Sequence, residues 1–449
     1  MVQSDEKTFQ KVCDFLKPLN LTFEDYEKFC QLMGDVMTRG LQKSEKSSIM
    51  MYPSYVAKIP DGTETGKYLA LDLGGTNYRV LLVQLPGKKA PPVIEERAYA
   101  IPHKIMSGAG NNLFEYIAKT LADFLKSHDL ADEELSLGFT FSFPCKQTGL
   151  KKAELVRWTK GFTADGVVGQ NVAELLQNAI DKMGCKVKCV AVVNDTVGTL
   201  ASCALEDKKC AIGLIVGTGT NAAYIERRER VENMEGEHAP QVVINTEWGA
   251  FGEDGEFEEF RTEYDKAVDA ESLHPGKQLF EKMVSGMYLG EIVRHILVRL
   301  VEEGLLFRGQ MPDELLRRDS VLTKYLTETE RDPEHLVYST TFMLTEELNV
   351  PVVEPIDSRI VRYACELVCK RAAYLAGAGI ASLLRRMKRT EVTVGIDGSL
   401  YKFHPKFRER MTDIIDKLRP KNTVFRLRLS EDGSGKGAAA IAAAAMRSD

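Results

Sequence analysis

The sequence lacks two features that would assign it to large classes of protein. It has no run of apolar residues long enough to span a bilayer, and residues 1–7 contain no apolar segment of the kind found in a secretory signal peptide. It also lacks a basic excess, because 59 Lys and Arg face 65 Asp and Glu, which gives a net charge of −6. A stable membrane anchor and a nucleic-acid-binding surface are therefore not expected.

Cysteine and histidine are present without the spacings that define a metal site or a disulfide framework. The nine cysteines are odd in number, and the pairs Cys185/Cys189 and Cys365/Cys369 have no matching set of histidines. The seven histidines share no spacing either. We expect free thiols in a reducing compartment, no zinc site and no histidine-based catalytic triad.

The composition that remains is that of a soluble globular protein, 44% hydrophobic and 28% charged, and 449 residues allow two or three domains. Apolar periodicity predicts helices over residues 4–48, 113–127, 172–180, 279–330, 359–387 and 438–446. Buried strands are expected at residues 137–143, 189–193 and 392–396. Strands and helices that alternate in this way favour an α/β fold.

Residues 69–83 predict a hairpin that binds phosphate. Two apolar strand segments flank a turn that contains Gly74, Gly75, Thr76 and Asn77, and Asp72 interrupts the first segment. The two glycines let backbone N–H groups approach an anion, and the carboxylate suits the magnesium ion that accompanies a phosphate. An ordinary hairpin with a Gly–Gly turn is the alternative.

A second stretch, residues 211–225, repeats this pattern about 144 residues further along the chain. Its turn reads Gly-Thr-Gly-Thr-Asn over residues 217–221, again between two strand segments. The repetition indicates an internal duplication of a phosphate-binding hairpin. Residues 217–222 also match the glycine pattern of dinucleotide-binding proteins, but that pattern must open a helix, and the Ala-Ala-Tyr-Ile that follows is typical of a strand.

Three acidic residues lie at the ends of predicted strands: Asp72, Asp195 and Asp397. Open α/β sheets bind ligands at strand ends, so these carboxylates are candidates for chemistry. Asp195 is the best candidate for a general base, because a continuous apolar strand ends just before it and would hold its carboxylate at a cleft. The alternative is that Asp195 caps a helix. Lys160 could steer a phosphate or sugar oxygen, or it could be a surface lysine.

Residues 432–437, Asp-Gly-Ser-Gly-Lys-Gly, form a glycine loop in front of the Ala-rich helix predicted at 438–446. The N-terminus of a helix binds anions, so this loop predicts a further phosphate or nucleotide contact. It is not a P-loop, because Ser430 stands where that pattern needs Gly and no Ser or Thr follows Lys436.

Seven motifs together resemble those of eukaryotic hexokinases, in the same order and from about residue 10 to the end of the chain. They read LDLGGTNYR at 71–79, LGFTFSFP at 137–144, WTKGF at 158–162, VNDT at 193–196, IVGTGTN at 215–221, NTEWGAFG at 245–252 and GIDGS at 395–399. The chain length matches a single hexokinase unit of roughly 50 kDa, as in glucokinase and invertebrate hexokinases.

The resemblance implies a two-lobed, actin-like α/β fold. Each lobe would be built on one copy of a duplicated, ribonuclease H-like core, and the active site would lie in the cleft between the lobes. The large lobe would comprise residues 1–66 and 199–433, and the small lobe residues 67–198 and 434–449.

The resemblance also implies roles for individual residues. Asp195, Lys160 and Arg79 would be catalytic, with Asp195 as the base. The sugar would contact Ser142, Phe143, Thr159, Lys160, Asn194, Asp195, Asn221, Glu247, Gln278 and Glu281. The nucleotide would contact Asp72, Gly74, Gly75, Thr76, Asn77, Thr218, Thr323, Thr327, Asp397, Gly398, Ser399, Ser434 and Gly435. No dedicated metal site of protein ligands is expected.

By the same resemblance, the chain would be an ATP-dependent, allosteric hexokinase of glycolysis that phosphorylates the 6-hydroxyl of D-glucose, and of fructose and mannose. Mg²⁺ would be held mainly through the phosphates of ATP. Glucose 6-phosphate is an expected inhibitor, and a monomer is expected. We expect a cytosolic protein, since the first residues are polar. The alternative is a non-catalytic sugar sensor on the same fold, which would lack the base that Asp195 supplies here.

Overall fold

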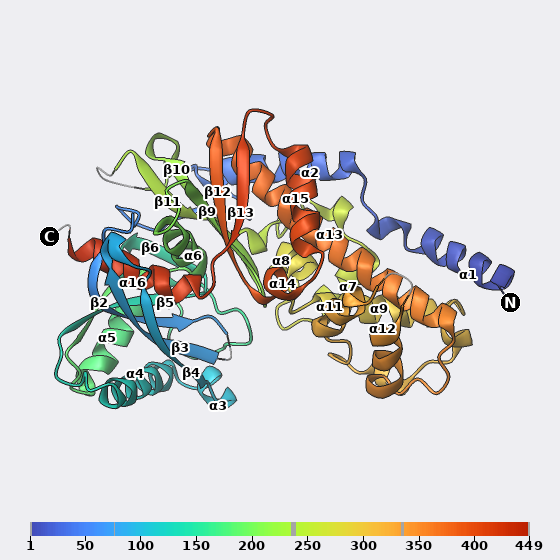
Figure 1. The fold of residues 1–449 in the computed structure, drawn as a ribbon, viewed down its shortest axis with the longest axis horizontal. Coiled ribbons are helices and arrows are strands. Elements are labelled where there is room, and N and C mark those ends of the chain that lie inside the picture. The colour runs from blue at the N-terminus through green and yellow to red at the C-terminus, as the bar shows by residue number, and fades with distance from the viewer. Residues whose placement is uncertain (1, 76, 235–238, 334–335, 448–449) are drawn as a thin grey trace.

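The computed structural model describes residues 2–75, 77–234, 239–333 and 336–447. Two β-sheets, each covered by helices, lie beside one another and divide the molecule into a small lobe and a large lobe (Figure 1). Helix α1 (Val2–Phe15) extends from the large lobe at one end of the molecule, and α16 (Gly433–Met446) brings the chain to the opposite end.

The small-lobe sheet has five strands in the order β4-β3-β2-β5-β8. Its strands are β2 (Thr65–Leu73), β3 (Asn77–Pro86), β4 (Val93–Ala100), β5 (Leu135–Phe141) and β8 (Val187–Val193). β2 and β3 form the first predicted hairpin, and β4 continues it antiparallel. β5 and β8 run parallel to β2, so both buried strands predicted in this part of the chain are confirmed.

The large-lobe sheet repeats this arrangement and adds one edge strand, in the order β1-β11-β10-β9-β12-β13. Its strands are β1 (Tyr52–Pro53), β9 (Cys210–Val216), β10 (Thr220–Arg227), β11 (Gln241–Asn245), β12 (Glu391–Asp397) and β13 (Val424–Leu429). A separate hairpin consists of β6 (Cys145–Gly149) and β7 (Lys152–Leu155).

The two sheets have the same topology. Counted along the chain from β2 and from β9, the strands of each sheet lie in the spatial order third, second, first, fourth, fifth. The first three strands are antiparallel in both sheets, and the last two are parallel to the first. The hairpins β2–β3 and β9–β10 therefore occupy equivalent places, which confirms the internal duplication.

Helices cover the sheets on both sides. The small lobe contains α3 (His103–Met106), α4 (Gly110–Ser127) and α5 (Val172–Lys182). The large lobe contains α2 (Phe23–Gly40), α7 (Glu263–Glu271), α8 (Leu279–Val284), α9 (Leu289–Glu302), α10 (Asp313–Leu316), α11 (Thr323–Arg331), α12 (Tyr338–Phe342), α13 (Pro355–Met387), α14 (Ser399–Phe403) and α15 (Phe407–Leu418). The helical stretch predicted at 279–330 is divided among α8 to α11, because Gly304 takes a left-handed conformation after α9 and Pro312 precedes α10.

Two helices are exchanged between the lobes. α6 (Asp195–Ala204) follows the last small-lobe strand but packs on β9, β10 and β12 of the large lobe, whereas α16 follows β13 and packs on β2, β5 and β8 of the small lobe. The helices also pack against each other, so closely that a Cβ on Gly437 would lie 1.8 Å from the carbonyl oxygen of Gly198. The lobe boundary expected between residues 198 and 199 falls inside α6.

The glycine loop of residues 432–437 differs from the prediction, because most of it is helical. α16 begins at Gly433, so the predicted helix start at 438 is wrong. Asp432 makes the turn into the helix in a left-handed conformation, with φ at 52°. Gly435 and Gly437 lie against Leu81 and Gly198, where a side chain does not fit, so these glycines serve close packing within the helix.

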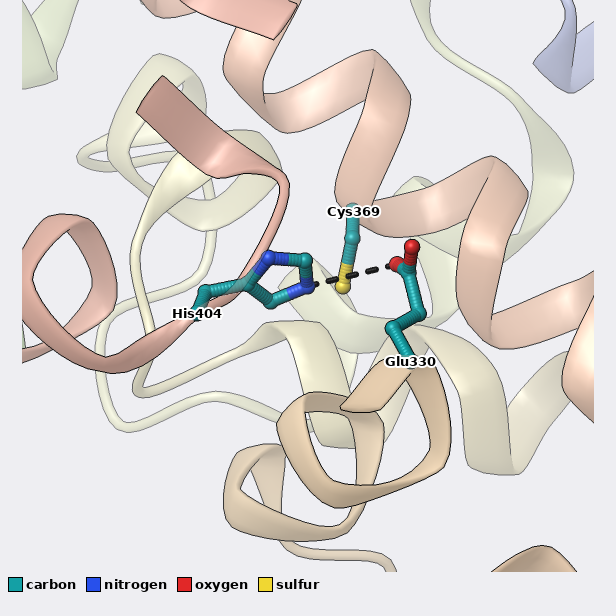
Figure 2. A group of neighbouring side chains, drawn as sticks. All are labelled: Glu330, Cys369 and His404. Atoms are coloured by element: carbon teal, nitrogen blue, oxygen red, sulfur yellow. Dashed lines mark ion pairs between the residues drawn. The ribbon is translucent and has the colours of Figure 1, made fainter. Parts of the chain in front are cut away.

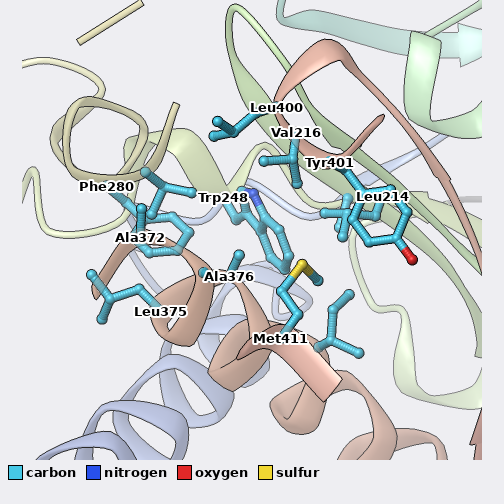
Figure 3. Close-up of a cluster of buried hydrophobic side chains, with 14 of the residues drawn as sticks. Leu214, Val216, Trp248, Phe280, Ala372, Leu375, Ala376, Leu400, Tyr401 and Met411 are labelled. Atoms are coloured by element: carbon cyan, nitrogen blue, oxygen red, sulfur yellow. The ribbon is translucent and has the colours of Figure 1, made fainter. Parts of the chain in front are cut away.

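The long helix α13 forms the centre of the large-lobe core. Its length and composition would be enough to cross a membrane, although no segment of that kind is expected from the sequence. However, 89% of its most apolar window is buried inside the protein. Trp248 is enclosed by α13, α8 and the large-lobe sheet (Figure 3). A Cβ on Gly379 of α13 would lie 2.8 Å from the ring of Trp248, so the small residues of α13 permit this contact.

Candidate active site

A polar pocket lies between the lobes, and residues from both sheets line it. The small lobe contributes the end of β5, the loop after β7 and the junction of β8 with α6. The large lobe contributes the β9–β10 turn, the residues after β11 and the start of α8. The lining residues are Ser142, Pro144, Thr159, Lys160, Asn194, Asp195, Ile215, Gly219, Thr220, Asn221, Glu247, Gly249, Gln278 and Glu281. The structure thus brings together nine of the ten residues expected to contact a sugar.

Phe143 is the tenth, and it does not line the polar pocket. Its side chain is buried in an aromatic cluster with Phe141, Trp158 and Phe162. The Lys160 ammonium lies 5.9 Å from the centre of the Phe143 ring and donates a hydrogen bond of 3.0 Å to the carbonyl oxygen of Ser142. The aromatic cluster therefore supports the loop that carries Lys160 and makes no contact with the pocket itself.

Asp195 is the first residue of α6, at the end of the buried strand β8. The alternative that it caps this helix is not what the structure shows, because the N-cap is Asn194, whose side chain accepts a hydrogen bond from the N–H of Thr196. One carboxylate oxygen of Asp195 accepts from the same N–H at 2.9 Å, and the other lies 3.9 Å from the ammonium of Lys160. An acceptor oxygen of Asp195 is thus directed to the pocket beside a cation.

Three residues of the polar pocket have left-handed backbone conformations, although none is glycine. The φ angles are 55° for Lys160, 53° for Glu247 and 54° for Gln278. Such conformations are uncommon for these residue types and cluster at functional sites, where packing compels them. Sequence patterns gave no indication of this strain, since only Gly, Asn and Asp would have been expected there.

Glu247 is the centre of an amide network. Its carboxylate accepts hydrogen bonds from the side-chain amides of Asn245 at 2.8 Å, Asn221 at 3.4 Å and Asn194 at 3.5 Å. Burial raises the pKa of Glu247 to about 7, and the neighbouring charge of Asp195 adds to this. Asn245 was not among the predicted site residues. Its position two residues before Glu247, at the end of β11, was the only available signal.

Other polar groups of the pocket are only partly paired within the described residues. Glu281 accepts from the N–H of Thr220 at 2.9 Å, and burial raises the pKa of this carboxyl group. The Ser142 hydroxyl and the Gln278 side-chain oxygen are buried and have no hydrogen-bond partner within the described ranges of the chain. Carboxylates, amides and unpaired oxygens at one site match a ligand whose groups both donate and accept, such as a polyhydroxylated molecule.

A second pocket, the α11–α14 pocket, lies beyond the β9–β10 turn. It is lined by Thr218, Gly286, Met287, Thr323, Lys324, Thr327, Glu328, Arg331, Ser399, Leu400 and Phe403. Of the expected nucleotide contacts, Thr218, Thr323, Thr327 and Ser399 line it. Thr218 faces this pocket while its neighbour Gly219 faces the polar pocket, so a single turn separates the two.

Asp72 and Asp397, two further residues expected at the nucleotide, each have protein partners. Asp72 pairs with Arg79 at 2.7 Å and accepts from the Ser434 hydroxyl at 2.7 Å. Asp397 accepts from the N–H groups of Gly398 and Gly433, and burial raises its pKa to about 6.

The glycines expected to contact the nucleotide differ in their surroundings. Gly74 lies beside the Ser142 hydroxyl, Gly75 has nothing near the position of a Cβ, and Gly435 packs on Leu81 inside α16. Asn77 begins β3 and is exposed, and Thr76 lies outside the described residues.

Comparison with known proteins identifies the family. A hexokinase family model matches residues 11–205, and a second hexokinase model matches residues 211–444. The chain belongs to the hexokinase family. It is therefore a phosphotransferase that uses ATP and has a hexose as acceptor.

Individual hexokinases are similar over most of the chain. The hexokinase of Schistosoma mansoni is 69% identical over 100% of both chains. Hexokinase-1 of Mus musculus is 48% identical over 92% of this chain and 43% of its own length. Human Hexokinase-2 is 47% identical over 96% of this chain and 48% of its own length. The chain thus spans about half the length of these mammalian hexokinases.

Solved hexokinase structures have the same fold. The Schistosoma mansoni hexokinase complexed with glucose matches with a TM-score of 0.95 and 68% identity over 98% of this chain and 99% of that chain. Another hexokinase crystal structure matches with a TM-score of 0.84 and 31% identity over 98% of this chain and 99% of that chain. The two-lobed, actin-like α/β fold with its duplicated core is therefore confirmed.

A hexokinase needs a place for the magnesium ion that accompanies ATP, and the residues around Asp72 fit this requirement. Mg²⁺ prefers oxygen ligands and is usually bound by one or two carboxylates together with substrate phosphates. Asp72 in β2 and Asp397 at the end of β12 provide such oxygens, and a Cβ on Gly75, in the turn after β2, would meet nothing within 4 Å. The described residues offer no dedicated cage of protein ligands at this position.

Elsewhere in this hexokinase, Glu330, Cys369 and His404 form a buried cluster that resembles a metal site (Figure 2). His404 Nε2 lies 3.2 Å from one oxygen of Glu330, but Arg410 already binds both oxygens of that carboxylate at 2.9 and 2.6 Å. Burial raises the pKa of the Cys369 thiol well above its usual range, so the thiolate that zinc requires is disfavoured. The cluster is a charge-balanced junction of α11, α13 and α15.

Proposed function

We propose that this hexokinase transfers the γ-phosphoryl group of ATP to the 6-hydroxyl of D-glucose, and to those of fructose and mannose. The observation that carries the proposal is the arrangement of the two pockets on opposite sides of one turn, with Asp195 in the polar pocket. The Schistosoma mansoni hexokinase, which has nearly the same fold, was solved with glucose. This supports glucose as the ligand of the polar pocket.

Asp195 is the proposed general base. Its free carboxylate oxygen accepts the proton of the 6-hydroxyl as that oxygen attacks phosphorus. Lys160, 3.9 Å from this carboxylate, offers positive charge to the transferring group. Phosphoryl transfer depends mainly on such positioning and charge neutralisation.

The other polar residues hold the sugar. Glu247 and Glu281 accept hydrogen bonds from its hydroxyls, while the amides of Asn194, Asn221 and Gln278 donate and accept. Both lobes contribute to this set, so the sugar is enclosed when the lobes meet. Enclosure excludes water, which would otherwise compete with the sugar for the phosphoryl group.

The phosphates of ATP are proposed to lie against the two glycine hairpins. Arg79 pairs with Asp72, and Gly217 of the turn lies against Gly398, next to Asp397. The adenosine would occupy the α11–α14 pocket beside Thr323, Thr327 and Ser399. Magnesium, when bound with ATP, neutralises phosphate charge, and Asp72 and Asp397 would hold it there.

A coupled assay of ATP-dependent phosphorylation tests this proposal directly. Turnover should be measured with glucose, fructose and mannose, with and without Mg²⁺. Turnover with at least one hexose, dependent on ATP, is expected. A non-catalytic sensor would bind sugar without turnover, but the family membership and the carboxylate of Asp195 disfavour that alternative.

Glucose 6-phosphate is proposed to inhibit the enzyme in competition with ATP. Its phosphate would take the N–H and hydroxyl donors of the two hairpin turns, and overlap and like charge would then exclude the phosphates of the nucleotide. Steady-state rates at several concentrations of ATP and product decide the matter. Inhibition that high ATP fails to relieve would contradict the proposal, as would no inhibition at millimolar product.

A cytosolic monomer remains the proposed physiological form. The burial of α13, the one helix among the described residues whose length and composition would allow it to cross a membrane, supports the cytosolic part of this proposal. Size-exclusion chromatography with light scattering and subcellular fractionation test the two parts of this proposal separately.

A further inference from the structure

An ion pair between the lobes lies beside the polar pocket. Arg157 follows β7 and directly precedes the segment with Thr159 and Lys160, which the small lobe contributes to the pocket. Its guanidinium binds both carboxylate oxygens of Glu253, at 3.0 and 3.5 Å. Glu253 belongs to the large lobe and lies just beyond Phe251 of the core.

The same carboxylate holds the opposite wall of the pocket. Glu253 accepts a hydrogen bond of 2.9 Å from the backbone N–H of Gln278, whose left-handed conformation directs its side chain into the polar pocket. Lys277, the neighbour of Gln278, places its ammonium 2.9 Å from the other oxygen of Glu253. Glu253 thus connects one pocket segment from each lobe.

We propose that the Arg157–Glu253 ion pair is a latch that stabilises the closed arrangement of the lobes and thereby sets the affinity for the sugar. Arg157 is a positioning residue: it does not line the pocket, and it acts through Glu253 and the segments on either side. The proposal rests on the proposed function insofar as the polar pocket is taken as the sugar site.

The physical environment makes this pair stronger than an ordinary surface ion pair. Only 7% of the Glu253 side chain and 28% of the Arg157 side chain are exposed, and two parallel N–H···O contacts fix the geometry. If the lobes separate, both groups move into water and the contact is lost. A ligand that binds only the closed arrangement then has an apparent affinity proportional to the closed fraction.

The test compares Arg157→Gln with Lys277→Gln. Both variants remove one cation from the same carboxylate, but only the first breaks a contact between lobes, since Lys277 and Glu253 are on the same lobe. For the hexose with the highest wild-type turnover, we expect Arg157→Gln to raise KM about three- to tenfold. The maximal rate and the KM for ATP of Arg157→Gln should change less than twofold. Lys277→Gln should leave the KM for the hexose, the KM for ATP and the maximal rate within twofold of the wild type.

A third variant and a stability measurement separate the latch from a general structural role. Arg157→Lys keeps the charge but not the paired geometry, so its KM should lie between those of the wild type and Arg157→Gln. The thermal midpoint of each ligand-free variant should be close to that of the wild type.

Several results would overturn the latch. One is an unchanged KM for the hexose in Arg157→Gln, and another is an equal effect of Arg157→Gln and Lys277→Gln on that KM. A third is a maximal rate of Arg157→Gln that falls while its KM rises. Failure of the proposed sugar site is distinguishable, because Glu247→Gln would then leave sugar binding intact by calorimetry.

Discussion

At the scale of single residues, the carboxylates of the polar pocket differ in environment and hence in role. Asp195 has one oxygen free toward the pocket and a lysine nearby, so it suits proton transfer. Glu247 is enclosed by three amides and has a raised pKa, so it suits recognition of a hydroxyl. This division of roles leads to two predictions.

Asp195→Asn should abolish most turnover while leaving sugar binding largely intact. The amide keeps the size of the side chain but cannot accept the proton, so the maximal rate should fall by about 10²- to 10⁴-fold. The coupled assay and calorimetry with glucose measure the two properties. Asp181→Asn, at an exposed position of α5, is the matched control. More than a tenth of wild-type turnover in Asp195→Asn would show that another group is the base.

Glu247→Gln should change the pH dependence of stability in the ligand-free protein. Because the pKa of Glu247 is raised to about 7, the folded state binds the proton more tightly than the unfolded chain. The wild type therefore loses stability as the pH rises from about 4.5 to about 7, and the glutamine variant lacks this loss.

The variant should be the more stable protein at pH 8, by up to about 3 kcal/mol, with a smaller difference at pH 5. Urea denaturation at both pH values measures this difference. Glu154→Gln, at an exposed position, is the control and should show no trend. A stability difference that is constant with pH would contradict the raised pKa.

At the scale of elements, the glycines of the crossing between α6 and α16 make a specific prediction. Gly437→Ala would place a Cβ 1.8 Å from the carbonyl oxygen of Gly198, and backbone cannot yield as a side chain does. We expect destabilisation of about 3 kcal/mol or more.

Gly34→Ala in α2 is the matched control, because nothing lies within 4 Å of its Cβ position and helix propensity favours Ala there. Chemical denaturation compares the two variants. Similar stabilities of Gly437→Ala and the wild type would contradict the close crossing.

The elements also show what sequence reasoning could and could not reach. The strands β5, β8 and β12 and both hairpins were predictable, because buried apolar runs bounded by Gly-rich turns depend on local residues. The helical part of the 432–437 loop was not, because those glycines serve contacts with Leu81 and Gly198, which are remote in the sequence. The role of Asn245 and the left-handed conformations of Lys160, Glu247 and Gln278 were not foreseen for the same reason, because both depend on tertiary packing.

At the scale of the whole molecule, glucose alone should make the protein more compact. The polar pocket takes residues from both lobes, and a sugar that contacts Lys160 and Glu247 together favours their approach. Small-angle scattering with and without glucose should show a smaller radius of gyration in its presence. Asp195→Asn should compact in the same way, since binding precedes chemistry. A radius that glucose leaves unchanged would count against closure.

The exchange of α6 and α16 has a consequence for the order in which the chain is synthesised. The small-lobe strands leave the ribosome early, but α16, which covers their inner face, consists of the last residues made. Apolar side chains on that face, Leu81 and Val193 among them, pack in the same core as Ile441 of α16. Residues 69–192 form a core on one face of this sheet, but the other face has no cover until α16 is made. The nascent protein must keep this apolar face from aggregating until the final helix is released.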